Sequence, residues 1–86
     1  MAIRARKLDK SVHSAEQTAF RELMIKARKV AGLTQRDLAD RLRKTQSFVA
    51  KYEGGERRID VVEFIAICRM IEVDPVKMLR KLDEAI

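Results

Sequence analysis

Apolar residues recur every three or four positions along most of the chain, and this spacing predicts helices. The first clear run has apolar side chains at positions 20, 23, 24, 27, 30 and 31, the pattern of a half-buried helix. Ser14 and Gln17 precede this run with the form of a capping box, and Gly32 follows it as a glycine commonly follows a helix C-terminus. We therefore predict a first helix that starts after Ser14 and ends before Gly32.

Two short helices are predicted next, and each follows a threonine. Thr34 precedes a helix over residues 35 to 42 or 43, and Thr45 precedes a helix over residues 46 to about 53. A threonine hydroxyl at this position can accept a hydrogen bond from a free backbone N–H group of the first helical turn. Gly54 and Gly55 then end the second of these helices, because glycine is a poor helix former.

Two further helices complete the pattern. Asp60 and Glu63 form a second capping box before a helix over residues 61–71, in which nine of eleven positions are apolar. Such a helix is either central to the domain or also faces a second subunit. Asp74 and Pro75 start the fifth helix, because proline is favoured at the first helical position. The apolar stripe of this helix is wider than one packing face needs and consists of Val76, Met78, Leu79, Leu82, Ala85 and Ile86.

Composition restricts the class of protein. The chain has 86 residues, of which 47% are apolar and 37% charged, as expected for one small globular domain. One cysteine and one histidine cannot form an internal disulfide or a structural zinc site. No stretch approaches the ~20 apolar residues of a membrane span, and no signal peptide is recognisable. We expect a cytoplasmic, all-α protein with no membrane contact, no metal and no cofactor.

The formal charge of +6 is unevenly distributed. It is +5 over residues 1–33, +3 over residues 34–59 and −2 over residues 60–86. Residues 1–13 hold four basic side chains without helical apolar spacing, which predicts a basic N-terminal arm ahead of a domain over residues 14–86. A basic front and an acidic back favour a polyanionic partner, although a solvated charged surface would have the same composition.

The two short helices within residues 35–53 are joined by a tight connection, which is the arrangement of a helix-turn-helix. Residues 33–75, LTQRDLADRLRKTQSFVAKYEGGERRIDVVEFIAICRMIEVDP, resemble the phage repressor/Cro-like (Xre-type) helix-turn-helix family. With the flanking helices, the resemblance covers residues 19–84. It implies a five-helix, lambda-repressor-like DNA-binding domain. Arg43 and Lys44 depart from the usual glycine and apolar residue of the turn, and a left-handed Arg43 should cost roughly 1 kcal/mol.

The resemblance also implies which residues contact DNA. Gln46 can read adenine and Lys51 can read guanine in the major groove, while Phe48 either touches a thymine methyl group or packs under the loop. Simpler roles remain open for the others, as helix caps or as solvated charges. The predicted base-reading residues are Thr45, Gln46, Ser47 and Lys51, and the predicted DNA-backbone contacts are Gln35, Arg43, Lys44, Arg57 and Arg58.

The function implied by the resemblance is that of a sequence-specific transcriptional regulator, bacterial or phage-encoded. We expect a repressor that binds an inverted repeat in double-stranded DNA as a homodimer. The surplus apolar residues predict pairing through the C-terminal helix, joined by the end of the fourth helix. Two alternatives stay open: an antitoxin whose partner is a toxin, and a controller protein of a restriction-modification system.

No residue pattern indicates an enzyme. Cys68 lies inside the most apolar predicted helix, where a cysteine behaves as a small buried hydrophobic residue. His13 has no cysteine near it in the sequence, and no pair of carboxylates is expected in a cleft. We therefore predict no catalytic residues.

Overall fold

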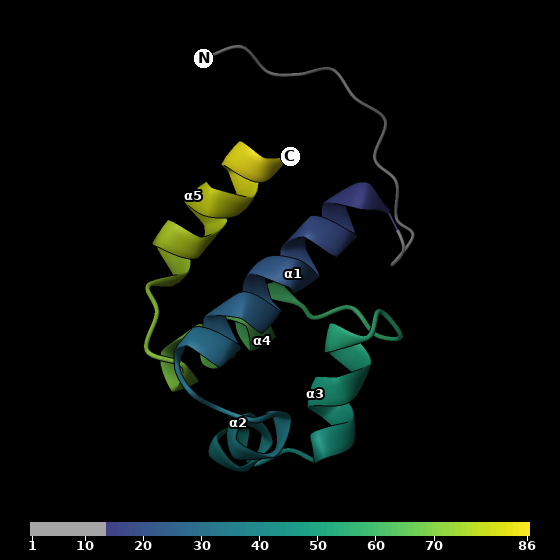
Figure 1. Cartoon of the computed structure of the whole chain (residues 1–86), viewed down its shortest axis with the longest axis vertical. Helices are drawn as coiled ribbons and strands as arrows, with labels where there is room; N and C mark the ends of the chain where they lie inside the picture. Colours follow the sequence, from purple (N-terminus) through teal and green to yellow (C-terminus); the bar gives the residue numbers. More distant parts are fainter. Residues whose placement is uncertain (1–13) are drawn as a thin grey trace.

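The computed structural model describes residues 14–86, so the arm predicted over residues 1–13 lies outside the described part. This part consists of α-helices without a strand (Figure 1). The helices are α1 (Ala15–Val30), α2 (Gln35–Leu42), α3 (Gln46–Glu53), α4 (Val61–Met70) and α5 (Pro75–Ala85). The predicted all-α fold with five helices is confirmed, and the observed ends differ from the predicted ones by at most a residue or two.

Side-chain caps start the helices where the sequence predicts. Thr34 with Asp37 before α2, and Asp60 with Glu63 before α4, form complete capping boxes in which each side chain bonds the other residue's backbone N–H. The remaining N-cap residues accept a hydrogen bond from the first turn of their helix; they are Ser14, Thr45 and Asp74. Because these caps are local, they fix each helix start without help from the rest of the fold.

The helices enclose one hydrophobic core. Figure 1 shows α1 crossing the middle of the molecule, with α5 alongside it and the α2–α3 pair at one end. Each helix adds buried apolar side chains, which are Met24, Leu38, Ala39, Val49, Tyr52, Phe64, Ile67, Cys68, Ile71 and Met78. Cys68 is fully buried, as predicted, and burial raises the pKa of its thiol to about 11.

The start of α4 differs from the sequence-based expectation of burial on most sides. Val61 and Val62 are 64% and 72% exposed, whereas Phe64, Ile67 and Cys68 are buried. The helix is central only from its second turn onward, because its first turn projects beyond the core. Within residues 14–86, no helix combines the length and apolar content that a membrane span requires.

Candidate nucleic-acid interface

The second helix of the helix-turn-helix pair, α3, buries one side and exposes its start. Val49 and Tyr52 are buried in the core. The hydroxyl of Thr45 accepts a hydrogen bond from the backbone N–H of Phe48 at 3.2 Å, so its capping role is real. All four residues predicted to read bases have exposed side chains around this helix; they are Thr45, Gln46, Ser47 and Lys51.

Arg36, a residue that sequence reasoning did not select, contacts one of these side chains. It lies in the first turn of α2, and its Nη2 donates a hydrogen bond to Oε1 of Gln46 at 3.3 Å. Both residues are exposed. The contact restrains the side chain of Gln46 at the surface, and only the folded turn between α2 and α3 brings the two residues together.

Gln35 begins α2, as predicted, and its side-chain amide forms a hydrogen bond within the domain. Its Nε2 donates to Oε1 of Glu53 at 3.0 Å, so its amide reaches into the domain from the start of α2. It is half-buried. A phosphate could therefore be bound by Gln35 only through its remaining amide atoms or after this hydrogen bond is broken.

Glu53 also forms a buried ion pair that the sequence pattern did not predict. Arg28 of α1 binds its carboxylate with two hydrogen bonds, from Nε at 2.8 Å and from Nη2 at 3.0 Å. Its Nη1 donates to the carbonyl of Leu33 at 2.7 Å. Both ionic side chains are less than 10% exposed, and the hydrogen bonds to Glu53 raise the pKa of the Arg28 guanidinium. Through Gln35, this network links α1, α2 and α3.

The turn between α2 and α3 has the left-handed residue that the sequence predicts. Arg43 has φ 55° and ψ 42°. Its backbone N–H donates to the carbonyl of Asp40, and the N–H of Lys44 donates to that of Ala39, both in the last turn of α2. Both side chains are exposed, as is that of Arg58 in the loop after α3. Exposed cations therefore lie in the turn before α3 and in the loop after it.

Replacing Arg43 with glycine should stabilise the domain, because glycine adopts φ > 0 without the Cβ clash. The relief of roughly 1 kcal/mol is partly offset by the larger entropy of an unfolded glycine, which leaves a few tenths of a kcal/mol or more. Arg43→Ala is the matched control, since it removes the same charge and keeps the Cβ. Urea unfolding measures the difference, and equal stability of the two variants would contradict strain at this turn.

Phe48, on α3, is covered by charged side chains. The Cζ atom of Arg57 lies 4.8 Å from the centroid of its ring, and Nζ of Lys44 lies 5.8 Å from the same centroid. Its ring also packs edge-on against Tyr52, with centroids 5.7 Å apart. Phe48 is half-buried, which favours the packing role over the thymine contact that was its alternative.

Arg57 is held in this position by a carboxylate from α4. Its Nη1 and Nη2 donate to Oε1 and Oε2 of Glu63 at 3.1 and 2.8 Å, and Nη1 also donates to the carbonyl of Arg58 at 2.9 Å. The hydrogen bonds from Arg57, and then that from the backbone N–H of Asp60, lower the pKa of Glu63. Arg57, predicted as a phosphate contact, is thus paired with an acidic side chain.

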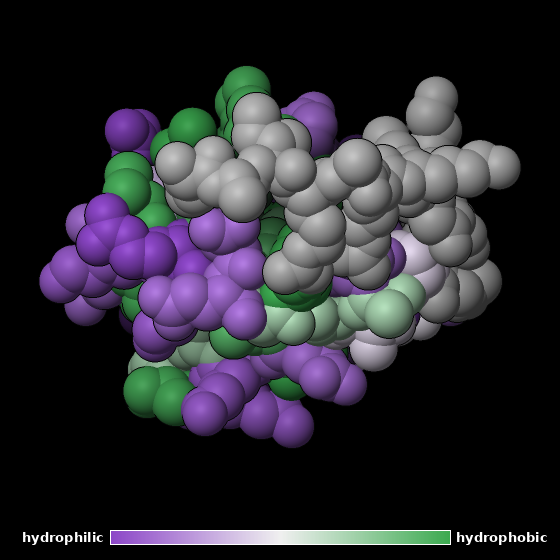
Figure 2. Space-filling model, turned by 90° about the horizontal axis from the view of Figure 1, so that it is seen from above, coloured by the Kyte–Doolittle hydropathy of each residue, from purple (hydrophilic) through white to green (hydrophobic). Residues whose placement is uncertain are grey.

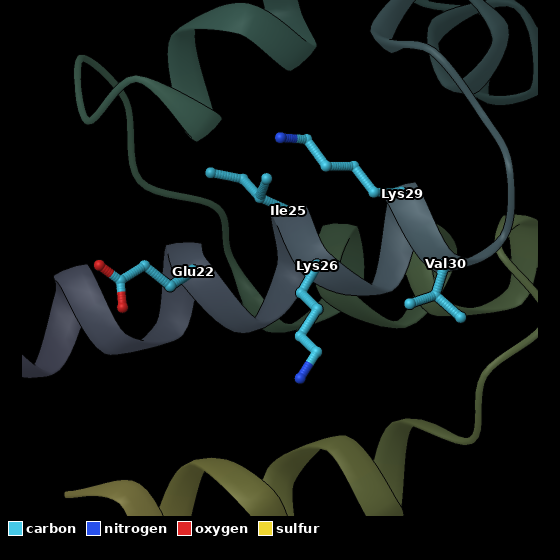
Figure 3. A pocket seen from close by; sticks show the side chains of 5 residues that line it. All are labelled: Glu22, Ile25, Lys26, Lys29 and Val30. Atoms are coloured by element: carbon cyan, nitrogen blue, oxygen red, sulfur yellow. The ribbon is translucent and has the colours of Figure 1, made fainter.

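One hollow on the surface of residues 14–86 lacks side chains that converge on a ligand. A hollow of about 410 Å³ lies over α1, lined by Glu22, Ile25, Lys26, Lys29 and Val30. Its lining comes from one helix, and the side chains spread apart rather than converge (Figure 3). In the part of the chain that the structure describes, no group of three or more His, Cys, Asp or Glu side chains could hold a metal ion.

Comparisons with known proteins agree with this geometry. The family model described as Helix-turn-helix matches residues 24–83. An XRE-family like protein from Pseudomonas syringae pv. tomato str. DC3000 is 47% identical, with a TM-score of 0.80, over 86% of this chain and 90% of that chain. No curated protein matched the sequence.

Two more distant structures share the fold. The clp gene regulator from C. glutamicum is 16% identical, with a TM-score of 0.74, over 86% of this chain and 96% of that chain. A restriction-modification controller protein from Aeromonas hydrophila is 23% identical, with a TM-score of 0.69, over 76% of this chain and 98% of that chain. At these identities the likeness concerns architecture alone.

Proposed function

Because the chain belongs to the Xre family of helix-turn-helix DNA-binding regulators, we propose that it is a repressor that binds an inverted repeat as a homodimer. The observation that carries the assignment of the DNA-binding surface is the exposed first turn of α3, with Lys44 and Arg57 over the ring of Phe48 in that turn. A helix-turn-helix inserts this end of its second helix into the major groove.

Base reading is assigned to the exposed residues around α3. Gln46 has the amide that pairs with N6 and N7 of adenine, and Lys51 can donate to O6 and N7 of guanine. The hydrogen bond from Arg36 restrains Gln46 before DNA arrives, which reduces the entropy lost on binding. Thr45 and Ser47 add hydroxyl groups at the same helix end.

Phosphate contacts are assigned to residues at the start of α2, in the turn before α3 and in the loop after it. They fix the orientation of the protein on the duplex and supply affinity that depends on salt rather than on base sequence. The proposed set is Gln35, Arg43, Lys44, Arg57 and Arg58.

The test compares one proposed base-reading residue with one proposed phosphate contact. Gln46→Ala should cost about 1–3 kcal/mol on the operator and little on random DNA, whereas Lys44→Ala should weaken both alike. Lys44→Ala should also reduce the slope of log K against log salt by about 0.9. Fluorescence anisotropy with both duplexes over a salt series measures these effects. Equal losses for Gln46→Ala on operator and random DNA would show that Gln46 reads no base.

Pairing is assigned to a surface formed by α5 and the start of α4. Val76 and Leu79 of α5 are 61% and 47% exposed, and Val61 of α4 lies with Leu79 and Leu82 along one groove. Figure 2 shows that hydrophobic residues, in green, reach the surface between hydrophilic ones, in purple, when the molecule is viewed from above. The sequence predicts that the end of α4 takes part in pairing; we propose that its start also does, because the exposed Val61 and Val62 lie there.

Two narrower roles, an antitoxin and a restriction-modification controller, stay predictions. The controller from Aeromonas hydrophila shares the fold at 23% identity, which does not carry over its role. A toxin-like gene beside this one would favour the antitoxin, and neighbouring restriction and modification genes would favour the controller.

A further inference from the structure

The outer edge of the Arg57 guanidinium is already occupied. Nη1 and Nη2, which form one of the two edges that an arginine can offer to an anion, bind both carboxylate oxygens of Glu63 at 3.1 and 2.8 Å. A carboxylate and a phosphate can each bind such an edge with two oxygens, through two parallel N–H···O hydrogen bonds. Arg57 therefore cannot bind a phosphate through Nη1 and Nη2 while these atoms bind Glu63.

The pair is open to exchange because it lies at the surface. The side chain of Arg57 is 42% exposed and that of Glu63 is 24% exposed, and exposed ion pairs contribute little net free energy. Glu63 would keep a partner after Arg57 left, since its Oε1 also accepts a hydrogen bond from the backbone N–H of Asp60 at 2.9 Å. The Phe48 ring, 4.8 Å from Cζ, would keep Arg57 at the start of α3.

We propose that Glu63 and a DNA phosphate compete for the same edge of Arg57, so that Glu63 is a specificity-determining residue. This inference rests on the proposed function. Where the backbone is well placed, the phosphate replaces Glu63 and Arg57 contributes to affinity. On DNA that fits poorly, Arg57 keeps Glu63, and the neutral pair attracts no phosphate. An opposing charge of this kind lowers affinity for incorrect sites more than for the correct one.

The test uses a mixed-sequence duplex of about two helical turns, because phosphates are present on any DNA. Four proteins form a double-mutant cycle: wild type, Glu63→Gln, Arg57→Met and the variant with both substitutions. Asp60→Asn is the matched control, since asparagine keeps the N-cap and removes one negative charge from the same helix end while Glu63 stays. Thermal unfolding of each variant confirms that all are folded at the assay temperature.

Glu63→Gln should tighten binding roughly three- to tenfold at 0.1 M salt and steepen the slope of log K against log salt by up to about 0.9, the contribution of one more phosphate contact. In the Arg57→Met protein, Glu63→Gln should change the affinity for DNA by about twofold or less. Only the screened, long-range repulsion between Glu63 and DNA would then be removed. Asp60→Asn in the wild-type protein should likewise change the affinity for DNA by about twofold or less.

Three results would overturn the inference. One is equal tightening by Glu63→Gln with and without Arg57; another is equal tightening by Asp60→Asn and Glu63→Gln. Each would mean that Glu63 acts as a general negative charge. The third is no tightening at all. If folded wild-type protein binds neither this duplex nor the DNA upstream of its own gene, the proposed function fails as well. Binding by wild type therefore separates a failure of the Glu63 inference from a failure of the proposed function.

Discussion

Replacing Glu53 with glutamine should destabilise the domain by about 3 kcal/mol, because the guanidinium of Arg28 would be left buried without its counter-charge. The two side chains are 9% and 4% exposed and share two hydrogen bonds. A glutamine has one oxygen acceptor in place of two and carries no charge. Its amide would also face Gln35, which donates to the same carboxylate in the native network.

Urea unfolding gives the measurement, since urea does not screen ion pairs as a guanidinium salt does. Arg57→Met is the control, because it breaks the exposed Arg57–Glu63 pair and should cost about 1 kcal/mol or less. The double variant Arg28→Met/Glu53→Leu should recover much of the loss, since a buried ion pair replaced by apolar side chains is often nearly neutral. A loss below about 0.5 kcal/mol for Glu53→Gln would mean that water solvates Arg28 in the native state.

The same substitution should weaken DNA binding even where the protein is fully folded. Glu53 ends α3 and holds Gln35 at the start of α2. A loosened network would let the two helices of the pair shift relative to α1, and proposed contacts from α2 and α3 would no longer fit one duplex together. Affinity measured well below the melting temperature separates this effect from unfolding.

The helix boundaries could be predicted because each depends on neighbouring residues. Thr34 and Asp37, or Asp60 and Glu63, are three positions apart, and their capping boxes form in the structure as isolated units. The left-handed Arg43 could be predicted in the same way, from its place in a turn whose geometry the family resemblance supplies. The capping boxes follow from local chemistry alone, whereas the conformation of Arg43 follows from the resemblance.

The contacts around the candidate interface could not be predicted in that way. Arg28 and Glu53 are 25 positions apart, and each resembles the many solvated charges of a chain that is 37% charged. Glu63 was recognised as a cap, but its second role, as the partner of Arg57, depends on how the loop after α3 folds back. A periodic pattern indicates which face of a helix is buried and does not indicate which charges meet.

Leu79→Glu should convert a dimer of about 20 kDa, twice the 9.9 kDa of one chain, into a folded monomer. Leu79 is 47% exposed, so a charge there costs the monomer little and would be buried in the proposed pairing surface. Val30→Glu is the matched control, because Val30 is 79% exposed at the end of α1, outside that surface. Sedimentation equilibrium at micromolar concentration measures both, and a monomeric wild type would contradict pairing through this surface in solution.

The loss of pairing should reduce affinity for an inverted repeat by a factor of roughly 10² or more, since the second half-site would no longer bind as part of one molecule. Leu82→Glu is expected to behave differently, because Leu82 is half-buried beside Phe20 and Phe64. Leu82→Glu should lower the melting temperature as well as the mass measured by sedimentation. If Leu79→Glu also unfolds the chain, the apolar stripe of α5 belongs to the monomer core.

The charges of α5 also predict the direction in which two copies pair. Lys77, Arg80 and Lys81 lie in its first two turns and Asp83 and Glu84 in its last, all exposed. Antiparallel α5 helices around a two-fold axis would bring Lys77 near Glu84 of the other copy, whereas parallel helices would bring like charges together. Lys77→Glu should therefore weaken the dimer, and Lys77→Glu/Glu84→Lys should restore it. Failure of the double variant to recover would contradict the antiparallel arrangement while leaving the Leu79 result unaffected.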